Sequence, residues 1–183
     1  MRTIAASCCT LEPLNVTHAE EMFRVLSDEA IYEFENQAPP SASWLAERYA
    51  RLERRTSPDG SQTWLNWVLR LPDGELAGYV QATLLASGKA LIAYELASRH
   101  WRKGIGSGAV SAMLDELQSN YGVSRFAAVL KAANTRSSGL LHRLGFQTGT
   151  ASEAAEFAVE ADELVMVKQA GGESAAQRTT SSA

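Results

Sequence analysis

The chain has 183 residues, a length that suits one domain with a single hydrophobic core. Its residues are 45% hydrophobic and 21% charged, as in ordinary globular proteins, and no apolar run approaches the roughly 20 residues of a membrane span. The formal net charge of -4 argues against a nucleic-acid surface, because duplex binding needs a basic face. We therefore expect a protein that binds neither nucleic acid nor a membrane.

The N-terminal third predicts one strand followed by two helices. Residues 3–14 have the length of a strand, and Thr17 with Glu20 forms a capping-box pattern that predicts a helix start. Apolar residues then recur at the spacing of one helical face: Ala19, Met22, Phe23 and Leu26. A second helix is predicted over residues 44–55, with Leu45, Tyr49 and Leu52 facing inward.

Cys8 and Cys9 are adjacent, and the sequence around them lacks the spaced cysteine and histidine pattern of a metal site. We interpret them as small buried residues of the first strand in a reducing compartment. The N-terminus has no long apolar segment, so no secretory signal is predicted and the expected location is the cytoplasm. No metal is expected.

The middle of the chain predicts three antiparallel strands, over residues 64–71, 75–85 and 90–97, separated by turn residues. The first alternates in hydrophobicity, with Leu65, Trp67, Leu69 and Leu71 on one face.

The second half predicts a long helix, a strand, a short helix and one or two closing strands. The long helix begins near Ile105, and its apolar stripe consists of Ile105, Ala109, Val110, Met113, Leu114 and Leu117. A strand is expected over residues 124–132, a helix over 135–144 ended by Gly145, and closing strands within 156–169.

This order indicates an α/β (α+β) fold with a mixed, mostly antiparallel sheet of six to seven strands and about four flanking helices. The unit from Ala90 to Leu130 is its parallel crossover. We predict a single domain over residues 1–168 and a disordered tail over 169–183, where glycine, serine, alanine and threonine dominate.

The segment "WRKGIGSGAV", residues 101–110, joins a strand to the long helix and contains three glycines. Such a turn places unpaired amides at the positive end of the helix dipole, which suits a phosphate or pyrophosphate, and Arg99, Arg102 and Lys103 add positive charge. A P-loop would need lysine followed by serine or threonine after the glycines, and the dinucleotide-binding motif has another glycine spacing.

The segment "HWRKGIGSGAV" resembles the acyl-CoA-binding signature of the GNAT superfamily of N-acetyltransferases, Gln/Arg-x-x-Gly-x-Gly/Ala, with Trp101 at its first position. A second segment, "NTRSSGLLHRLGF", is similar to the family's Asn-x-x-Ser…Leu-Gly-Phe helix. The opening segment resembles the ribosomal-protein N-terminal (RimJ/RimL-like) acetyltransferase branch, with Glu12 in place of its usual arginine. The resemblance covers residues 1–168 and implies transfer of an acetyl group from acetyl-CoA to a primary amine.

The resemblance also implies a cofactor site. It assigns the pyrophosphate to the glycine turn, consisting of Arg102, Lys103, Gly104, Ile105, Gly106 and Ser107. It assigns the pantetheine arm and the acetyl oxygen to the backbone of Glu95, Leu96 and Ala97, where two strands splay apart. Arg143, in the second motif, belongs to the same binding set, and a homodimer through edge strands is a further expectation.

Three residues are candidates for the chemistry. Asn134 would hydrogen-bond the pantetheine arm or a bound water, or cap its helix, or do both. Ser137 would protonate the leaving thiolate, because many relatives have a tyrosine one turn later and this chain has Leu141; the alternative is a solvent-facing serine. Glu95 would accept the amine proton through water. The family's base often lies several positions earlier, and Glu95 could face away from the substrate.

Other polar residues have plainer interpretations. His100 and His142 are expected at the surface, and Glu33 with Glu35 either attracts a cationic amine or forms a solvated acidic loop. Rival functions are a longer acyl-CoA donor, an antibiotic or polyamine acceptor, a toxin-type acetyltransferase, and a CoA-binding regulatory domain without catalysis.

Overall fold

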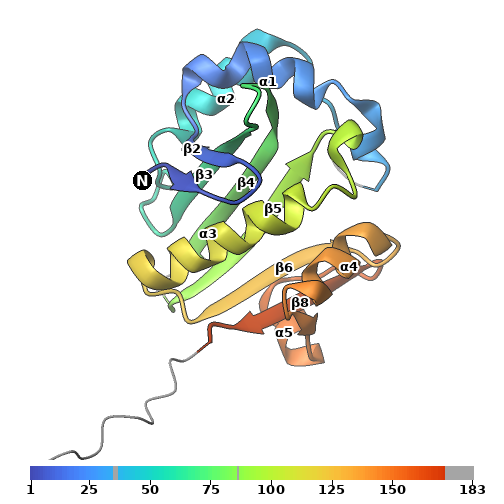
Figure 1. The fold of residues 1–183 in the computed structure, drawn as a ribbon. Coiled ribbons are helices and arrows are strands. Elements are labelled where there is room, and N and C mark those ends of the chain that lie inside the picture. The colour runs from blue at the N-terminus through green and yellow to red at the C-terminus, as the bar shows by residue number, and fades with distance from the viewer. Residues whose placement is uncertain (35–36, 86, 172–183) are drawn as a thin grey trace, which may run out of the picture.

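The computed structural model describes residues 1–34, 37–85 and 87–171. Figure 1 shows one twisted sheet with helices on both faces. The strands are β1 (Ile4–Ala5), β2 (Thr10–Pro13), β3 (Thr63–Arg70), β4 (Leu76–Leu85), β5 (Lys89–Leu96), β6 (Arg125–Lys131), β7 (Gln147–Thr148) and β8 (Glu163–Gln169). The α-helices are α1 (Ala19–Leu26), α2 (Ala42–Leu52), α3 (Ile105–Tyr121), α4 (Thr135–Arg143) and α5 (Ala151–Glu156). Short 3-10 helices are η1 (Val16–His18), η2 (Glu29–Tyr32) and η3 (Ser98–His100).

Within the described residues the sheet has eight strands in the order β1-β2-β3-β4-β5-β6-β8-β7. Every neighbouring pair is antiparallel except β5 and β6, which are parallel and joined by α3. The mixed, mostly antiparallel α/β sheet and the parallel crossover were both predicted correctly. The strand and helix numbers are slightly higher than the prediction.

Two hydrophobic cores lie on opposite faces of the sheet. One face of β3, which includes Leu65 and Trp67, packs in the core formed with the buried stripe of α3. The other face, which includes Val68, packs in the core formed with α1 and α2. The alternation in β3 therefore predicted one buried face correctly, while the second face is also covered by helices.

The N-terminal segment differs from the single strand that was predicted. Residues 3–14 form a hairpin of β1 and β2, in which the Ala6 amide donates to the Cys9 carbonyl at 2.9 Å across the turn. Cys8 and Cys9 therefore lie in this turn rather than within a strand, although Cys9 is buried as expected. The helical segment also starts earlier, because Asn15, not Thr17, provides the capping side chain, and its capping-box partner is His18.

The C-terminal part adds two elements that were not predicted, β7 and α5, before the closing strand β8. β8 includes Gln169, and Gly171 accepts a hydrogen bond from Gln118, so ordered contacts continue past residue 168. The remainder of the predicted tail, residues 172–183, lies outside the described residues. None of the described helices is both long and apolar enough to span a bilayer.

Candidate active site

The parallel strands β5 and β6 pair at only one end. Their register runs from Lys89 opposite Arg125 to Leu91 opposite Ala127, after which they diverge (Figure 1). A cleft of about 590 Å³ lies along the open part and is bordered by β5, β6, α4 and the chain that precedes α3. The divergence leaves main-chain groups of both strands without a ladder partner, so this is a place where a ligand's amide groups could hydrogen-bond to the sheet.

The N-terminus of α3 lies next to this cleft. Its N-cap, Gly104, has a φ of +80° in the left-handed region, and no side chain caps the helix. The first intrahelical bond is donated by the Gly108 amide to the Gly104 carbonyl at 2.9 Å, which leaves the first-turn amides available to a ligand. Exposed Arg102 and Lys103 precede the turn, and Arg102 lines the cleft. The arrangement favours an anion.

The three glycines of this turn have different structural reasons. Gly104 needs its positive φ, while a Cβ there would meet nothing within 4 Å. A Cβ on Gly106 would lie 3.1 Å from Leu140 of α4, and one on Gly108 would lie 2.7 Å from the Cys8 sulfur. Gly106 and Gly108 therefore allow α4 and the N-terminal hairpin to pack closely against α3.

The end of β5 forms one wall of the cleft. Gly78 of β4 lies so close to this strand that a Cβ would overlap the Glu95 carbonyl oxygen. The Ala97 amide donates to Ala77 at 2.9 Å and is thus engaged within the sheet. Leu96 lies on the open edge, where its carbonyl accepts a 2.8 Å hydrogen bond from the Trp101 indole.

Tyr94 joins β5 to α4 across the cleft. Its hydroxyl lies 2.7 Å from the Ser137 hydroxyl and 3.2 Å from the Ser137 carbonyl. Burial raises the pKa of Tyr94 to about 12, so its phenol stays protonated at neutral pH. Asn134 caps α4 by accepting from the Ser137 amide at 3.0 Å, and Leu141 packs fully buried in the core.

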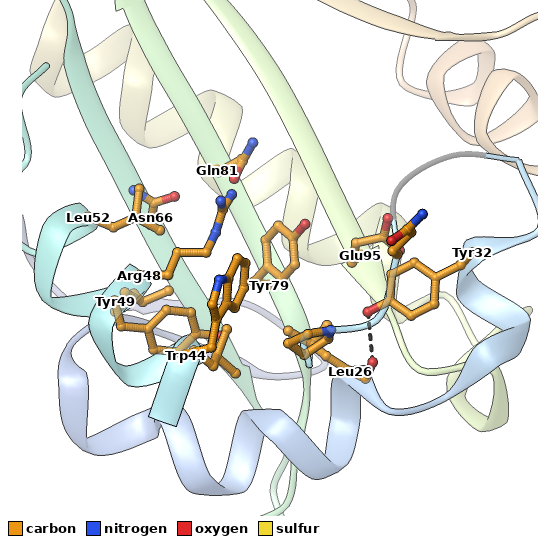
Figure 2. Close-up of a pocket in the computed structure, with 14 residues that line it drawn as sticks. Leu26, Tyr32, Trp44, Arg48, Tyr49, Leu52, Asn66, Tyr79, Gln81 and Glu95 are labelled. Carbon is orange, nitrogen blue, oxygen red and sulfur yellow. Dashed lines mark hydrogen bonds between the residues drawn. The ribbon is translucent and has the colours of Figure 1, made fainter. Parts of the chain in front are cut away.

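A second pocket of about 180 Å³ adjoins the cleft from the side of α1 and α2 (Figure 2). The two share four lining residues, Arg48, Tyr79, Gln81 and Glu95. In Figure 2 the Arg48 side chain extends from α2 toward Gln81 and Tyr79 on β4. Glu95 therefore faces the junction of the two cavities, where a donor from one could meet an acceptor from the other.

Aromatic hydroxyls surround this junction. The Tyr32 hydroxyl donates to the Leu26 carbonyl at 2.7 Å, and burial, with a smaller contribution from Glu95, raises the pKa of Tyr32 to about 12. Burial and Glu95 also raise the pKa of Tyr79. Both phenols are neutral at physiological pH and line the acceptor side of the junction beside this carboxylate.

The structure brings together most of the residues predicted for the site. Glu95, Leu96, Arg102, Asn134, Ser137 and Arg143 all line the cleft. Gly104, Ile105, Gly106 and Ser107 form the beginning of α3 beside it. Among the described His, Cys, Asp and Glu side chains, no group of three is placed to hold a metal ion.

The structure places His100, His142 and Glu33 in different surroundings. His100 is buried, not at the surface, and its ring lies 3.5 Å from the Glu75 carboxylate; His142 is exposed as predicted. Glu33 pairs with Arg136 at 2.7 Å, and the Arg136 guanidinium lies 4.2 Å from the centre of the Trp101 ring. Glu35 lies outside the described residues.

Sequence reasoning gave no role to Tyr94, Arg48, Tyr79 or Gln81. Tyr94 had one usable signal, since it precedes the candidate Glu95 on the same strand and alternation sends it to the other face. Arg48 lies on a helix far from β5 in the sequence, so only the tertiary fold shows it at the junction.

Comparisons with known proteins decide the family. The sequence model described as "Acetyltransferase (GNAT) domain" matches residues 9–147. The chain belongs to the GNAT acetyltransferase family. This GNAT chain is 26% identical over 149 residues to "Uncharacterized N-acetyltransferase p20" of Bacillus licheniformis, covering 80% of this chain and 83% of the relative.

Solved structures agree with the GNAT fold. The ribosomal-protein-S5-alanine acetyltransferase of Vibrio fischeri superposes with a TM-score of 0.75 at 15% identity, over 92% of this chain and 97% of that one. Mycobacterium smegmatis RimJ, solved in complex with CoA-disulfide, has a TM-score of 0.75 at 20% identity, over 92% and 88%. The predicted resemblance to this superfamily is thus confirmed, and its structural neighbours include ribosomal-protein acetyltransferases.

Proposed function

We propose that this GNAT acetyltransferase takes its acetyl group from acetyl-CoA and transfers it to a primary amine, either a peptide amino terminus or a small amine. The observation that carries the proposal is the uncapped start of α3 beside the cleft between β5 and β6. The residues present fit a CoA thioester: free first-turn amides and exposed cations suit its pyrophosphate, and the open edge of β5 suits an amide-containing arm.

In this proposal the amine enters through the α1–α2 side and reaches Glu95. The amine nitrogen attacks the thioester carbon, the carbon–sulfur bond breaks, and the amine's excess proton passes to Glu95, directly or through water. An α-amine, with a pKa near 8, needs less help from a base than a lysine, with a pKa near 10.4.

On the other wall, the Tyr94 and Ser137 hydroxyls would return a proton to the departing thiolate. Their mutual hydrogen bond allows Ser137 to donate while Tyr94 resupplies it, or the reverse. Asn134 holds the start of α4, so it positions Ser137 even where it makes no substrate contact. Arg143, which lines the cleft, supplies positive charge for the donor's anionic part.

The experiment is calorimetry with acetyl-CoA followed by thiol release in the presence of amines, on the wild type and two matched variants. Gly104→Glu places bulk and negative charge at the start of α3. Gly122→Glu makes the same change at the other end of α3, where φ is also positive and a Cβ also meets nothing within 4 Å.

We expect micromolar binding that Gly104→Glu abolishes and Gly122→Glu retains. Equal loss in both variants would indicate general destabilisation and argue against an anion site at Gly104. Binding without thiol release from any amine would favour the non-catalytic CoA-binding alternative, which the presence of Leu141 in place of a tyrosine makes a specific rival.

A further inference from the structure

We propose that the acceptor is a peptide whose amino terminus is followed by acidic side chains, held in a basic groove along the C-terminal end of α2. This inference rests on the proposed function and names its substrate class. We call the groove the arginine groove and define it by Arg48, Arg51 and Arg54.

The arginine groove is a cavity of about 500 Å³ that adjoins the 180 Å³ pocket lined by Arg48 and Glu95, which we call the acceptor pocket. The two cavities share Arg48, Leu52, Asn66 and Gln81. Its far end is formed by the chain after α2, including Ser57 and Pro58, and by Trp64 of β3. An acceptor with its amine at Glu95 would therefore have a lined path for the rest of its chain.

The three arginines give the arginine groove a positive charge. No carboxylate is among the described residues that line the arginine groove, and its three arginines are exposed and form no ion pair with the described carboxylates. The adjacent Glu53 carboxylate accepts instead from the Val16 amide at 3.3 Å. In a protein of formal net charge -4, three arginines without an ion pair to a described carboxylate along one cavity indicate an anionic ligand.

The spacing of the arginines favours a peptide over a compact molecule. Arg48 and Arg51 lie on α2, about 4.5 Å apart along its axis at 1.5 Å per residue, and Arg54 lies in the turn after the helix. An extended peptide rises about 3.3–3.6 Å per residue, so two or more of its residues are needed to pass all three arginines. Arg48 lines the same two cavities as Glu95, whereas Arg54 lines only the arginine groove, so contact with both Glu95 and Arg54 favours an acceptor longer than one amino acid.

The acceptor pocket itself contains an unsatisfied polar group. Tyr49 is 3% exposed, lines this pocket, and its hydroxyl has no hydrogen-bond partner among the described residues. A buried hydroxyl without a partner is costly, and a peptide backbone passing from Glu95 to Arg48 would offer it a carbonyl or an amide. A ligand with a cationic amine at Glu95, a backbone group at Tyr49 and anionic side chains at the arginines matches the amino-terminal end of an acidic peptide.

The test measures kcat/KM by thiol release with two matched six-residue peptides, one with Ser at the amino terminus and Glu at positions 2–4, the other with Gln at those positions. Wild-type enzyme is compared with the double variant Arg51→Glu/Arg54→Glu. Arg24→Glu is the control for charge, because Arg24 is exposed on α1 and does not line the groove. Free glutamate serves as a small anionic amine.

We expect the wild type to prefer the Glu peptide by about tenfold or more, a preference that the double variant loses and Arg24→Glu keeps. The preference should also shrink between 20 mM and 500 mM salt, because exposed charges are screened. Turnover of both peptides at equal rates, or better turnover of free glutamate, would overturn the inference while leaving the acetyltransferase proposal intact. Absence of turnover with every amine would instead count against the proposed function.

Discussion

The hydroxyl groups of Tyr94 and Ser137 lie 2.7 Å apart, and they come from different elements, β5 and α4, on either side of the cleft. Leu141, one turn after Ser137 on α4, is fully buried in the core and leaves no side chain for the cleft. A phenol therefore reaches the cleft from the strand instead of the helix.

Tyr94→Phe removes this phenol and is expected to lower kcat by about 10²-fold, the lower end of what general acids contribute, with little change in KM for acetyl-CoA. Ser137→Ala should cost less if Tyr94 can donate directly. Combining both should cost little more than Tyr94→Phe alone, because the two hydroxyls act as one unit. Additive losses in steady-state kinetics would contradict a shared role, and Tyr121→Phe, at the end of α3, is the control.

The pH profile of the same reaction provides a second measurement. Burial raises the pKa of Tyr94 to about 12, and the neutral phenol is the form that donates a proton. The rate should therefore fall through ionisation of Tyr94 only above about pH 11, well beyond the ordinary tyrosine pKa of about 10. A basic limb near pH 9 that disappears in Tyr94→Phe would show that this phenol titrates earlier than its surroundings indicate.

Asp28 links the acceptor side to the turn before α3, because its carboxylate accepts from the Ser98 amide at 2.7 Å and the Ala30 amide at 3.2 Å. Burial acts to raise the pKa of this carboxyl, but the hydrogen bonds, chiefly from Ser98, outweigh it and lower the pKa. Because the pKa of this carboxyl is lower in the folded state than in the unfolded state, the ionised carboxylate stabilises the fold above its unfolded-state pKa, near 3.9. This stabilisation is lost as the pH falls through the folded-state pKa.

Asp28→Ala should therefore lower the free energy of unfolding by about 1 kcal/mol at pH 7, as for other lost caps, and by progressively less below pH 4. Urea denaturation at pH 7 and pH 3 measures the difference. The exposed neighbour Glu29 provides the control substitution to alanine. A difference between Asp28→Ala and wild type that stays constant over this range would mean that the charge of Asp28 is not what stabilises the link.

The two suggested roles of Asn134, helix capping and substrate binding, can be tested separately. Its side chain accepts from the Ser137 amide at 3.0 Å, and aspartate caps helices as well as asparagine does. Asn134→Ala should cost about 1 kcal/mol of stability, whereas Asn134→Asp should keep it. If Asn134 also donates to the substrate, Asn134→Asp will still weaken acetyl-CoA binding in calorimetry, and unchanged affinity would leave capping as its role.

The spacing of apolar residues predicted most of this fold, because a long amphipathic helix or strand repeats its apolar residues on the face that becomes buried. The stripe of α3, from Ile105 to Leu117, is buried as predicted. The β1–β2 hairpin was missed because its turn contains Ser7 and Cys8 and carries no glycine, proline, asparagine or aspartate to mark it. α5 was missed because it is six residues long and buries none of them, so it has no apolar stripe.

The residues of the site also fall into those that the sequence predicted and those that only the structure shows. Residues that belong to a local motif, such as Gly104 in the first motif and Asn134 in the second, could be placed from spacing and resemblance, whereas the junction depends on segments distant in the chain. Arg48 of α2 and Glu95 of β5 line the same two cavities only because α1 and α2 cover one face of the sheet. The glycine turn was interpreted as bare backbone for a ligand, and the structure adds that Gly108 is needed for packing.

Gly108 and Cys8 make a coupled pair that tests this packing. A Cβ at position 108 would lie 2.7 Å from the Cys8 sulfur, so Gly108→Ala should force the N-terminal hairpin away from α3 and cost about 1–3 kcal/mol, the usual range for overpacking. Cys8→Ala removes the sulfur. In that background the same Gly108→Ala change should be neutral or stabilising by up to about 1 kcal/mol, because alanine is the better helix former. Chemical denaturation of the four proteins of this cycle gives the coupling energy, and equal costs of Gly108→Ala in both backgrounds would mean that the hairpin does not limit the residue at this position.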